Sequence, residues 1–141
     1  MFYIYAWNGF IFPSFSNGTS CSPSCYDTGT WNIAFQGTDG DRESTPQAIC
    51  EGNLVATGTI KATSLNPYDT AEPITVYLMK EQRGIDPVIK VREVEVDVNG
   101  RPSSFRINAG DVELGNYYIE VVEGESPKSV QYSGYGDFYL E

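Results

Sequence analysis

Few side chains in this 141-residue sequence could perform chemistry. Histidine is absent, which removes the commonest general base and the commonest zinc ligand. There are three cysteines, and 19 acidic residues face 9 basic ones, for a formal net charge of -10. Such a chain should repel phosphate backbones and anionic lipid headgroups, so we expect no nucleic-acid partner. An enzyme built from it would need carboxylates, a cysteine or a bound cation.

The three cysteines cannot all pair within one chain, because their number is odd. Cys21 and Cys25 lie four residues apart around a proline, and Cys50 stands alone. A bridge from either Cys21 or Cys25 to Cys50 would clip the loop before residue 28 to the following strand. Three free thiols are the alternative. Zinc normally takes four ligands, so three cysteines without histidine make a poor site, and we expect no cofactor.

Acidic side chains alternate in the polar segment after residue 36. Asp39, Asp41 and Glu43 could gather oxygen ligands for calcium. The pattern of a helix-loop-helix calcium site is not met, because Ser44 stands where glycine is needed and Cys50 where the last glutamate should be. We therefore interpret the segment as a solvated turn and expect no metal site.

One short motif could belong to an enzyme. Asp27-Thr28-Gly29-Thr30 resembles the Asp-Thr-Gly-Ser/Thr motif of aspartic proteases, in which two such aspartates share a proton. Here the motif follows Ser24-Cys25-Tyr26 instead of the hydrophobic strand that the family uses, and the later chain offers no convincing partner segment. We expect no enzyme, and a protease-like activity is the weakest of the alternatives.

Aromatic side chains offer a different chemistry, because their rings can stack on sugars. Five of them form a candidate binding surface if their rings are exposed: Trp7, Trp31, Tyr132, Tyr135 and Tyr139. Packing in a core is the alternative for each. A recognition module for carbohydrate or protein is therefore one hypothesis for the function.

The elements that position these residues should be β-strands, and the clearest signal lies between residues 91 and 98. Val94, Val96 and Val98 alternate with acidic residues, the period of a strand with one buried face. Asn99-Gly100 then provides the two positive-φ positions of a tight hairpin turn.

A two-residue turn there would set the register of the next strand. It would place Phe105 opposite Val94 on the core face and Arg106 opposite Glu93 on the solvent face. A third strand follows, with one side formed by Tyr117, Ile119 and Val121.

Further strands are predicted over residues 30–36, 53–65 and 74–79, the last nearly continuously apolar and therefore central. Strands about every ten residues, without helical stripes between them, indicate an all-β fold. We predict an antiparallel Greek-key β-sandwich, transthyretin-like or immunoglobulin-like, with an aromatic-rich N-terminal extension. Residues 53–141 should form the sandwich, and residues 1–52 should be strands and a loop that act as an arm or belong to the same domain.

The second part of the chain, from Leu54 onward, resembles transthyretin-like domains, including the B-repeats of bacterial collagen adhesins and carboxypeptidase regulatory-like modules. The matching residues are Asp97, Asn99, Gly100, Phe105, Ile107, Gly115, Tyr117, Ile119 and Val121, after the earlier segments Gly58-Thr59-Ile60 and Ile74-Thr75-Val76-Tyr77-Leu78. The link from Gly100 to Phe105 is longer than usual and contains Pro102, which implies a bulge or an edge strand. The resemblance implies a seven-stranded sandwich.

The first twelve residues are unusually rich in large apolar side chains. A basic leader region is absent and Pro13 comes too early for a membrane span, so we expect neither a recognisable signal peptide nor membrane insertion. The segment could pair into the domain's own sheet, or it could be an arm that docks on a neighbouring subunit. The arm would consist of Phe2, Tyr3, Ile4, Tyr5, Trp7, Phe10 and Phe12.

Our leading functional hypothesis is a non-enzymatic structural subunit of a surface or virion assembly, of the decoration or tail-associated type, attached through this arm. Its partners would be other protein subunits in a homo- or hetero-oligomer, with carbohydrate as a further candidate. Its location would be a virion or the extracellular or cell surface.

Overall fold

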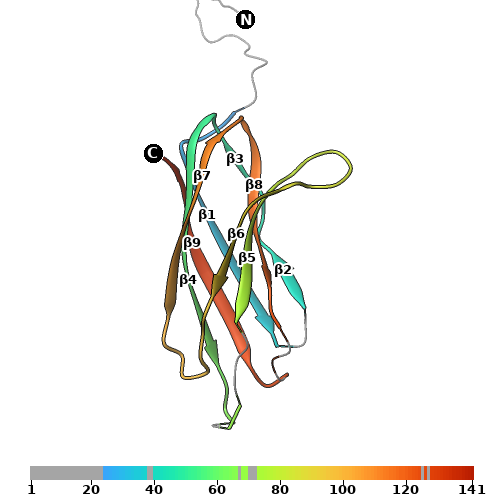
Figure 1. Ribbon diagram of the computed structural model, residues 1–141, viewed down its shortest axis with the longest axis vertical. Helices are drawn as coiled ribbons and strands as arrows, with labels where there is room; N and C mark the ends of the chain where they lie inside the picture. The colour runs from blue at the N-terminus through green and yellow to red at the C-terminus, as the bar shows by residue number, and fades with distance from the viewer. Residues whose placement is uncertain (1–23, 38–39, 67, 70–72, 125, 127) are drawn as a thin grey trace, which may run out of the picture.

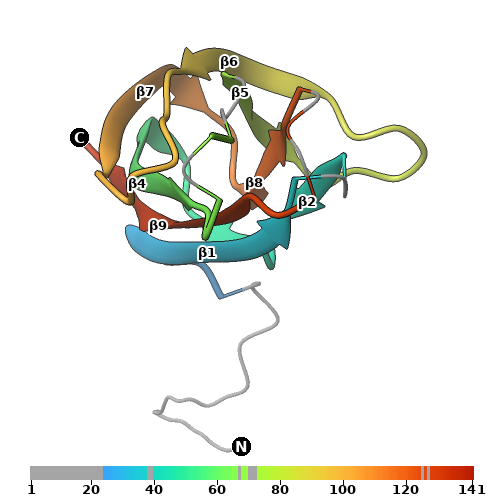
Figure 2. The ribbon, with the colours of Figure 1, turned by 90° about the horizontal axis from the view of Figure 1, so that it is seen from below.

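The structure is a computed structural model that describes residues 24–37, 40–66, 68–69, 73–124, 126 and 128–141. These residues form nine β-strands in two antiparallel sheets that face each other (Figures 1 and 2). They contain no helix that could cross a membrane. The predicted all-β, two-sheet antiparallel architecture is confirmed. The candidate arm over residues 2–12, with Trp7, lies outside the described residues, as does Cys21.

Each sheet combines strands from distant parts of the sequence. The first has the order β1-β9-β4-β7, from β1 (Thr28–Gln36), β9 (Gln131–Leu140), β4 (Gly52–Thr63) and β7 (Ser103–Val112). The second has the order β2-β8-β5-β6, from β2 (Asp41–Glu43), β8 (Gly115–Val122), β5 (Ile74–Lys80) and β6 (Val88–Val94), and β3 (Gln47–Ile49) also pairs with β8. Residues 28–49 therefore supply strands to both sheets.

The core lies between the two sheets and follows the predicted alternation. Tyr117, Ile119 and Val121 of β8 are buried, as is Val94 of β6, while Val96 packs against the edge of the core. Strand β5 lies between β8 and β6, which confirms that its nearly continuous apolar sequence marks a central strand.

The hairpin predicted at Asn99-Gly100 is wrong. Strand β6 pairs with β5, and β7 pairs with β4 in the other sheet, so Phe105 and Arg106 do not face β6 in a ladder. Asn99 instead forms a bridge with Thr63, and the Gly100 N–H donates to the Ala62 carbonyl at 2.9 Å. Gly100 does have the expected positive φ, 81°. The turn residues thus bend a chain that passes from one sheet to the other, because the end of β4 offers them backbone partners.

A disulfide joins Cys25 to Cys50, one of the two predicted pairings. Its two ends are also held by backbone hydrogen bonds, from Tyr26 N to Ala48 O at 3.1 Å and from Cys50 N to Tyr26 O at 3.0 Å. Since β1 belongs to the first sheet and β3 to the second, this staple connects the edges of the two sheets.

Candidate functional site

The predicted aromatic surface is divided between the core and the solvent. Trp31 and Tyr132 are each 2% exposed, so these two residues present no ring face to a ligand, and their prediction as stacking residues is wrong. Tyr135 is 63% exposed, and Tyr139 is partly buried. Strand parity explains why Tyr132 is buried and Tyr135 is exposed, because neighbouring residues of β9 point to opposite faces of the sheet.

Trp31 is buried because three glycines leave room for its indole ring. A methyl group at Gly58, Gly134 or Gly136 would overlap the Trp31 side chain or press closely on it. The indole N–H donates to the Thr57 carbonyl at 3.0 Å, which satisfies the only polar group of the ring. Gly134 and Gly136 of β9, together with Gly58 of β4, therefore form a slot for this tryptophan.

Tyr135 lies on what we call the open face, the outward side of the β1-β9-β4-β7 sheet. Across the neighbouring strands it faces Asn32 of β1 and Thr59 of β4. The Thr59 hydroxyl lies 3.4 Å from that of Ser104 on β7, so a row of neutral hydrogen-bonding groups crosses the sheet through Tyr135. Of the described residues on the strands of this sheet, Tyr135 is the only exposed large apolar one.

The few charged groups of the open face are partly paired. Arg106 Nη2 donates to Glu141 Oε2 at 2.9 Å. A hydrogen bond with Tyr139 and the charge of Glu141 raise the pKa of Arg106, so this cation is fixed at the edge of the face. Tyr139 is partly buried, whereas Tyr135 is 63% exposed, so Tyr135 is the more accessible aromatic ring of the open face.

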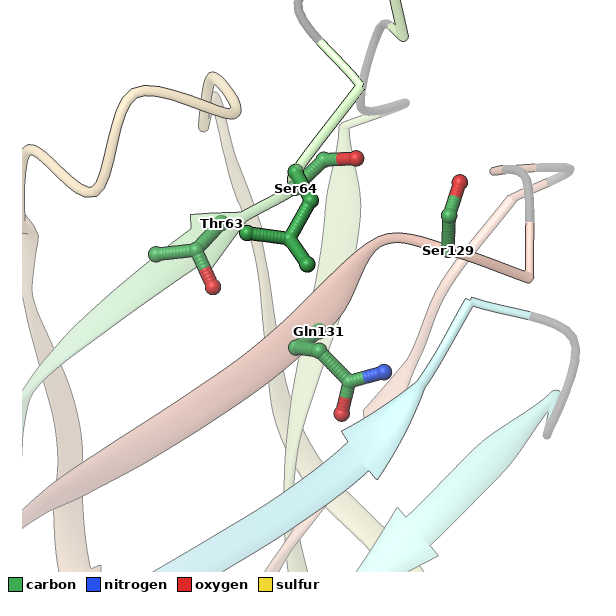
Figure 3. A pocket seen from close by; sticks show the side chains of 5 residues that line it. Thr63, Ser64, Ser129 and Gln131 are labelled. Carbon is green, nitrogen blue, oxygen red and sulfur yellow. The ribbon is translucent and has the colours of Figure 1, made fainter.

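A pocket opens at the end of the same face, where β4 ends and β9 begins (Figure 3). Its volume is about 440 Å³, and it is lined by Thr63, Ser64, Leu65, Ser129 and Gln131. Thr63 and Gln131 face each other across β4 and β9, in the same outward series as Thr59 and Tyr135. Gln131 lies four positions before Tyr135, which corresponds to about 13 Å along a strand.

Asp69 holds the two walls of this pocket together. Its carboxylate accepts a hydrogen bond from Ser64 Oγ at 2.5 Å and another from the Ser129 hydroxyl. These bonds, the one from Ser129 foremost, lower the pKa of Asp69. Because Ser64 belongs to the β4–β5 connection and Ser129 to the β8–β9 connection, one carboxylate fixes both loops.

The acidic segment proposed as a weak metal candidate is not the solvated turn that we predicted. Asp39 lies outside the described residues, but Asp41 and Glu43 form the edge strand β2, where Glu43 faces Glu120 of β8. Burial raises the pKa of Glu120 to about 7, with further contributions from a hydrogen bond to Asp41 and from the charge of Glu43. In the described part of the chain, no group of acidic or cysteine side chains is arranged to hold a metal ion.

Asp27 is an exposed residue in the bend before β1. Its carbonyl accepts a hydrogen bond from Leu140 N at 2.9 Å, so its backbone serves to join β1 to β9.

The second sheet exposes a different surface, which was not predicted from the sequence. The connection between β5 and β6 projects from the body of the molecule in both views (Figures 1 and 2), and Ile85 on it is 91% exposed. On the outward side of β6, Val88 and Val91 are 49% and 53% exposed. Val91 faces Tyr77, and Val88 faces Met79. Met79 is buried, so we call the other four residues, Tyr77, Ile85, Val88 and Val91, the hairpin strip.

Hydrogen bonds fix the base of the projecting loop. Asp86 accepts hydrogen bonds from the Tyr118 hydroxyl at 2.6 Å and from Gln82 N at 2.9 Å, and these bonds lower its pKa. Glu81 N donates to Asn116 O at 2.8 Å. Ile85 is thus presented by a loop whose base is fixed. The sequence did contain a signal for this exposed residue, because Gly84-Ile85-Asp86 places an isolated isoleucine beside a glycine in a polar loop.

Comparisons with known proteins bear on the fold alone. No protein-family model matches the chain, and no curated protein matches it. Among solved structures, it is similar to a chain of the naturally occurring empty particles of Cowpea mosaic virus, with 11% identity, a TM-score of 0.45, and 88% of this chain and 91% of that one covered. A chain of an empty virus-like particle of the same virus gives 12% identity, a TM-score of 0.46 and coverage of 88% of both.

The carbohydrate-binding module TmCBM61, solved in complex with β-1,4-galactotriose, gives 17% identity, a TM-score of 0.38, and coverage of 77% of this chain and 66% of that one. At these scores the likenesses support no conclusion about what this chain binds or assembles with.

Proposed function

We propose that this protein is a non-enzymatic structural subunit that assembles with further copies of itself through the hairpin strip. The observation that carries the proposal is the exposure of Ile85, Val88 and Val91 on one projecting hairpin. Exposed apolar side chains gathered on one projecting element are typical of protein contact sites, because leaving them in water costs free energy that a partner recovers. The fixed loop base reduces the entropy that binding would cost.

Charge supports a second copy as the partner. Residues 80–92 contain four of the nine basic residues of the chain but only two of its 19 acidic ones. The rest of the molecule is therefore even more acidic than the whole, and another copy offers this hairpin an oppositely charged surface.

The disulfide supports a location on a virion or at an extracellular or cell surface. Bridges such as Cys25–Cys50 persist in oxidising compartments and are rare in reducing ones. The Greek-key topology and the transthyretin-like relationship of residues 54–141 are part of the same proposal.

Sedimentation velocity of the full chain, over a concentration series, tests the assembly. We expect the wild type to self-associate and Ile85→Asp to weaken association at least ten-fold. Tyr68→Asp is the matched control, because Tyr68 is also exposed, at 90%, but lies in the β4–β5 connection, at the other end of β5 from the projecting loop. A wild type that stays monomeric throughout, or equal effects of the two variants, would overturn the proposal.

The N-terminal arm is a separate part of the proposal. Deletion of residues 1–13 should abolish assembly and leave a folded sandwich, as judged by circular dichroism and cooperative unfolding. A truncated chain that still assembles normally would remove the arm from the proposal and leave the hairpin strip.

A further inference from the structure

The open face and its pocket share a chemistry that the assembly surface lacks. Around Tyr135 the outward side chains are mostly hydroxyls and amides, among them Asn32, Thr59 and Ser104. Protein contact sites have an apolar centre surrounded by polar groups, which the hairpin strip provides and the open face does not. A single exposed aromatic ring among neutral donors and acceptors fits a ligand that has both apolar ring faces and many hydroxyls.

The charge of the molecule and of the open face further limits the class of ligand. The molecule is strongly acidic, which disfavours anionic ligands, and the Arg106 cation of this face is already paired with Glu141. Lys61 and Asp137 also lie on this face, on neighbouring strands, so neither sign of charge dominates the centre. An uncharged ligand therefore matches the side chains of the open face best.

The position of the pocket sets the minimum length of a ligand that fills the whole site. It continues the outward series of β4 and β9, since Thr63 and Gln131 belong to both the face and the pocket lining. Leu65 adds an apolar wall, and Asp69 fixes Ser64 and Ser129 in place. A ligand that covers Tyr135 and also enters the pocket must be about 13 Å long or longer.

We propose that the open face binds a neutral, extended oligosaccharide, with one sugar stacked on the Tyr135 ring and the end of the chain in the pocket beside Gln131. This inference does not depend on the proposed assembly, because it uses the outward side of the other sheet. Stacking aligns the ligand along β9, and the hydroxyl and amide groups on either side supply its hydrogen bonds.

The test is a titration of the isotope-labelled full chain with a panel of neutral β-1,4-linked and α-1,4-linked hexasaccharides, followed by amide NMR shifts. We expect at least one hexasaccharide to bind and to shift the amides of residues 131–137. Tyr135→Ala should reduce its affinity about ten-fold or more, whereas Tyr135→Phe should retain it, because the ring face and not the hydroxyl makes the contact. Tyr26→Ala is the matched control, since Tyr26 is 62% exposed against 63% for Tyr135 but lies before β1.

A second variant tests the pocket. Gln131→Ala should weaken binding of the hexasaccharide and leave binding of the corresponding disaccharide, which covers Tyr135 alone, unchanged. Absence of binding by every member of the panel at millimolar concentration would overturn the inference. So would equal affinities of the wild type and a folded Tyr135→Ala variant. A monomeric wild type in the sedimentation experiment would overturn the assembly and leave this site untouched.

Discussion

Removing the Cys25–Cys50 disulfide should destabilise the protein by an amount that follows from the loop it closes. The two cysteines are 25 residues apart in the sequence. Closing a loop of that length in the unfolded chain removes about 12 cal/mol/K of entropy, which corresponds to about 3.5 kcal/mol at 25 °C. For a chain of this size, that loss of unfolding free energy lowers the midpoint of thermal unfolding by about 12 °C.

The assay is urea and thermal unfolding of the Cys25→Ala/Cys50→Ala variant, followed by circular dichroism and compared with the oxidised wild type. Cys21→Ser is the control, because it removes the third thiol and leaves the bridge in place. A midpoint that is the same with and without the bridge would refute the reasoning, since the staple between the sheet edges would then restrict nothing in the unfolded chain. Peptide mapping of the oxidised protein should recover Cys25 linked to Cys50.

Two further predictions concern the core and the acidic edge. Gly136→Ala should cost about 1–3 kcal/mol in urea unfolding, because the added methyl group overlaps the Thr57 carbonyl and lies 2.8 Å from Trp31 Nε1. Gly29→Ala should cost less, because the atoms nearest to its added methyl group belong to the Gln47 side chain, at 3.3 Å. Equal losses would contradict the tryptophan slot. The pKa of Glu120 is raised in the folded state from 4.5 to about 7, so its contribution to stability is complete below pH 4.5 and is lost as the pH rises through 7. Glu120→Gln should remove about 1 kcal/mol of the fall in stability across that range, since solvent screens a partly exposed group. An unchanged pH profile of the stability would count against the raised pKa of Glu120.

The sequence predicted the strands well because their signal is local. Alternation of apolar and polar residues fixes which side of a strand is buried, and Ile119 and Val121 behave as their pattern indicates. Alternation does not say which strand lies beside which. The hairpin at Asn99-Gly100 failed for that reason: both partners of the predicted turn are strands, but β6 pairs with the preceding strand β5 and β7 pairs with β4, far away in the sequence.

The candidate sites show the same limit. Trp31 could not be distinguished from an exposed aromatic until Gly58, Gly134 and Gly136 were known to meet around its ring, and these glycines come from two strands far apart in the chain. Tyr135 was correctly placed among exposed candidates, whereas the pocket beside Gln131 was not predicted, because its walls come from two separate loops. Ile85 was overlooked because a single isoleucine in a loop has no periodic pattern.

The position of β9 has a consequence for how the protein is made. This strand is synthesised last of the nine, yet it lies between β1 and β4 and supplies the ladder partners of both. On the ribosome, β1 must therefore wait with its apolar side chains uncovered until residues 131–140 have left the exit tunnel, which makes the nascent chain a natural client for chaperones.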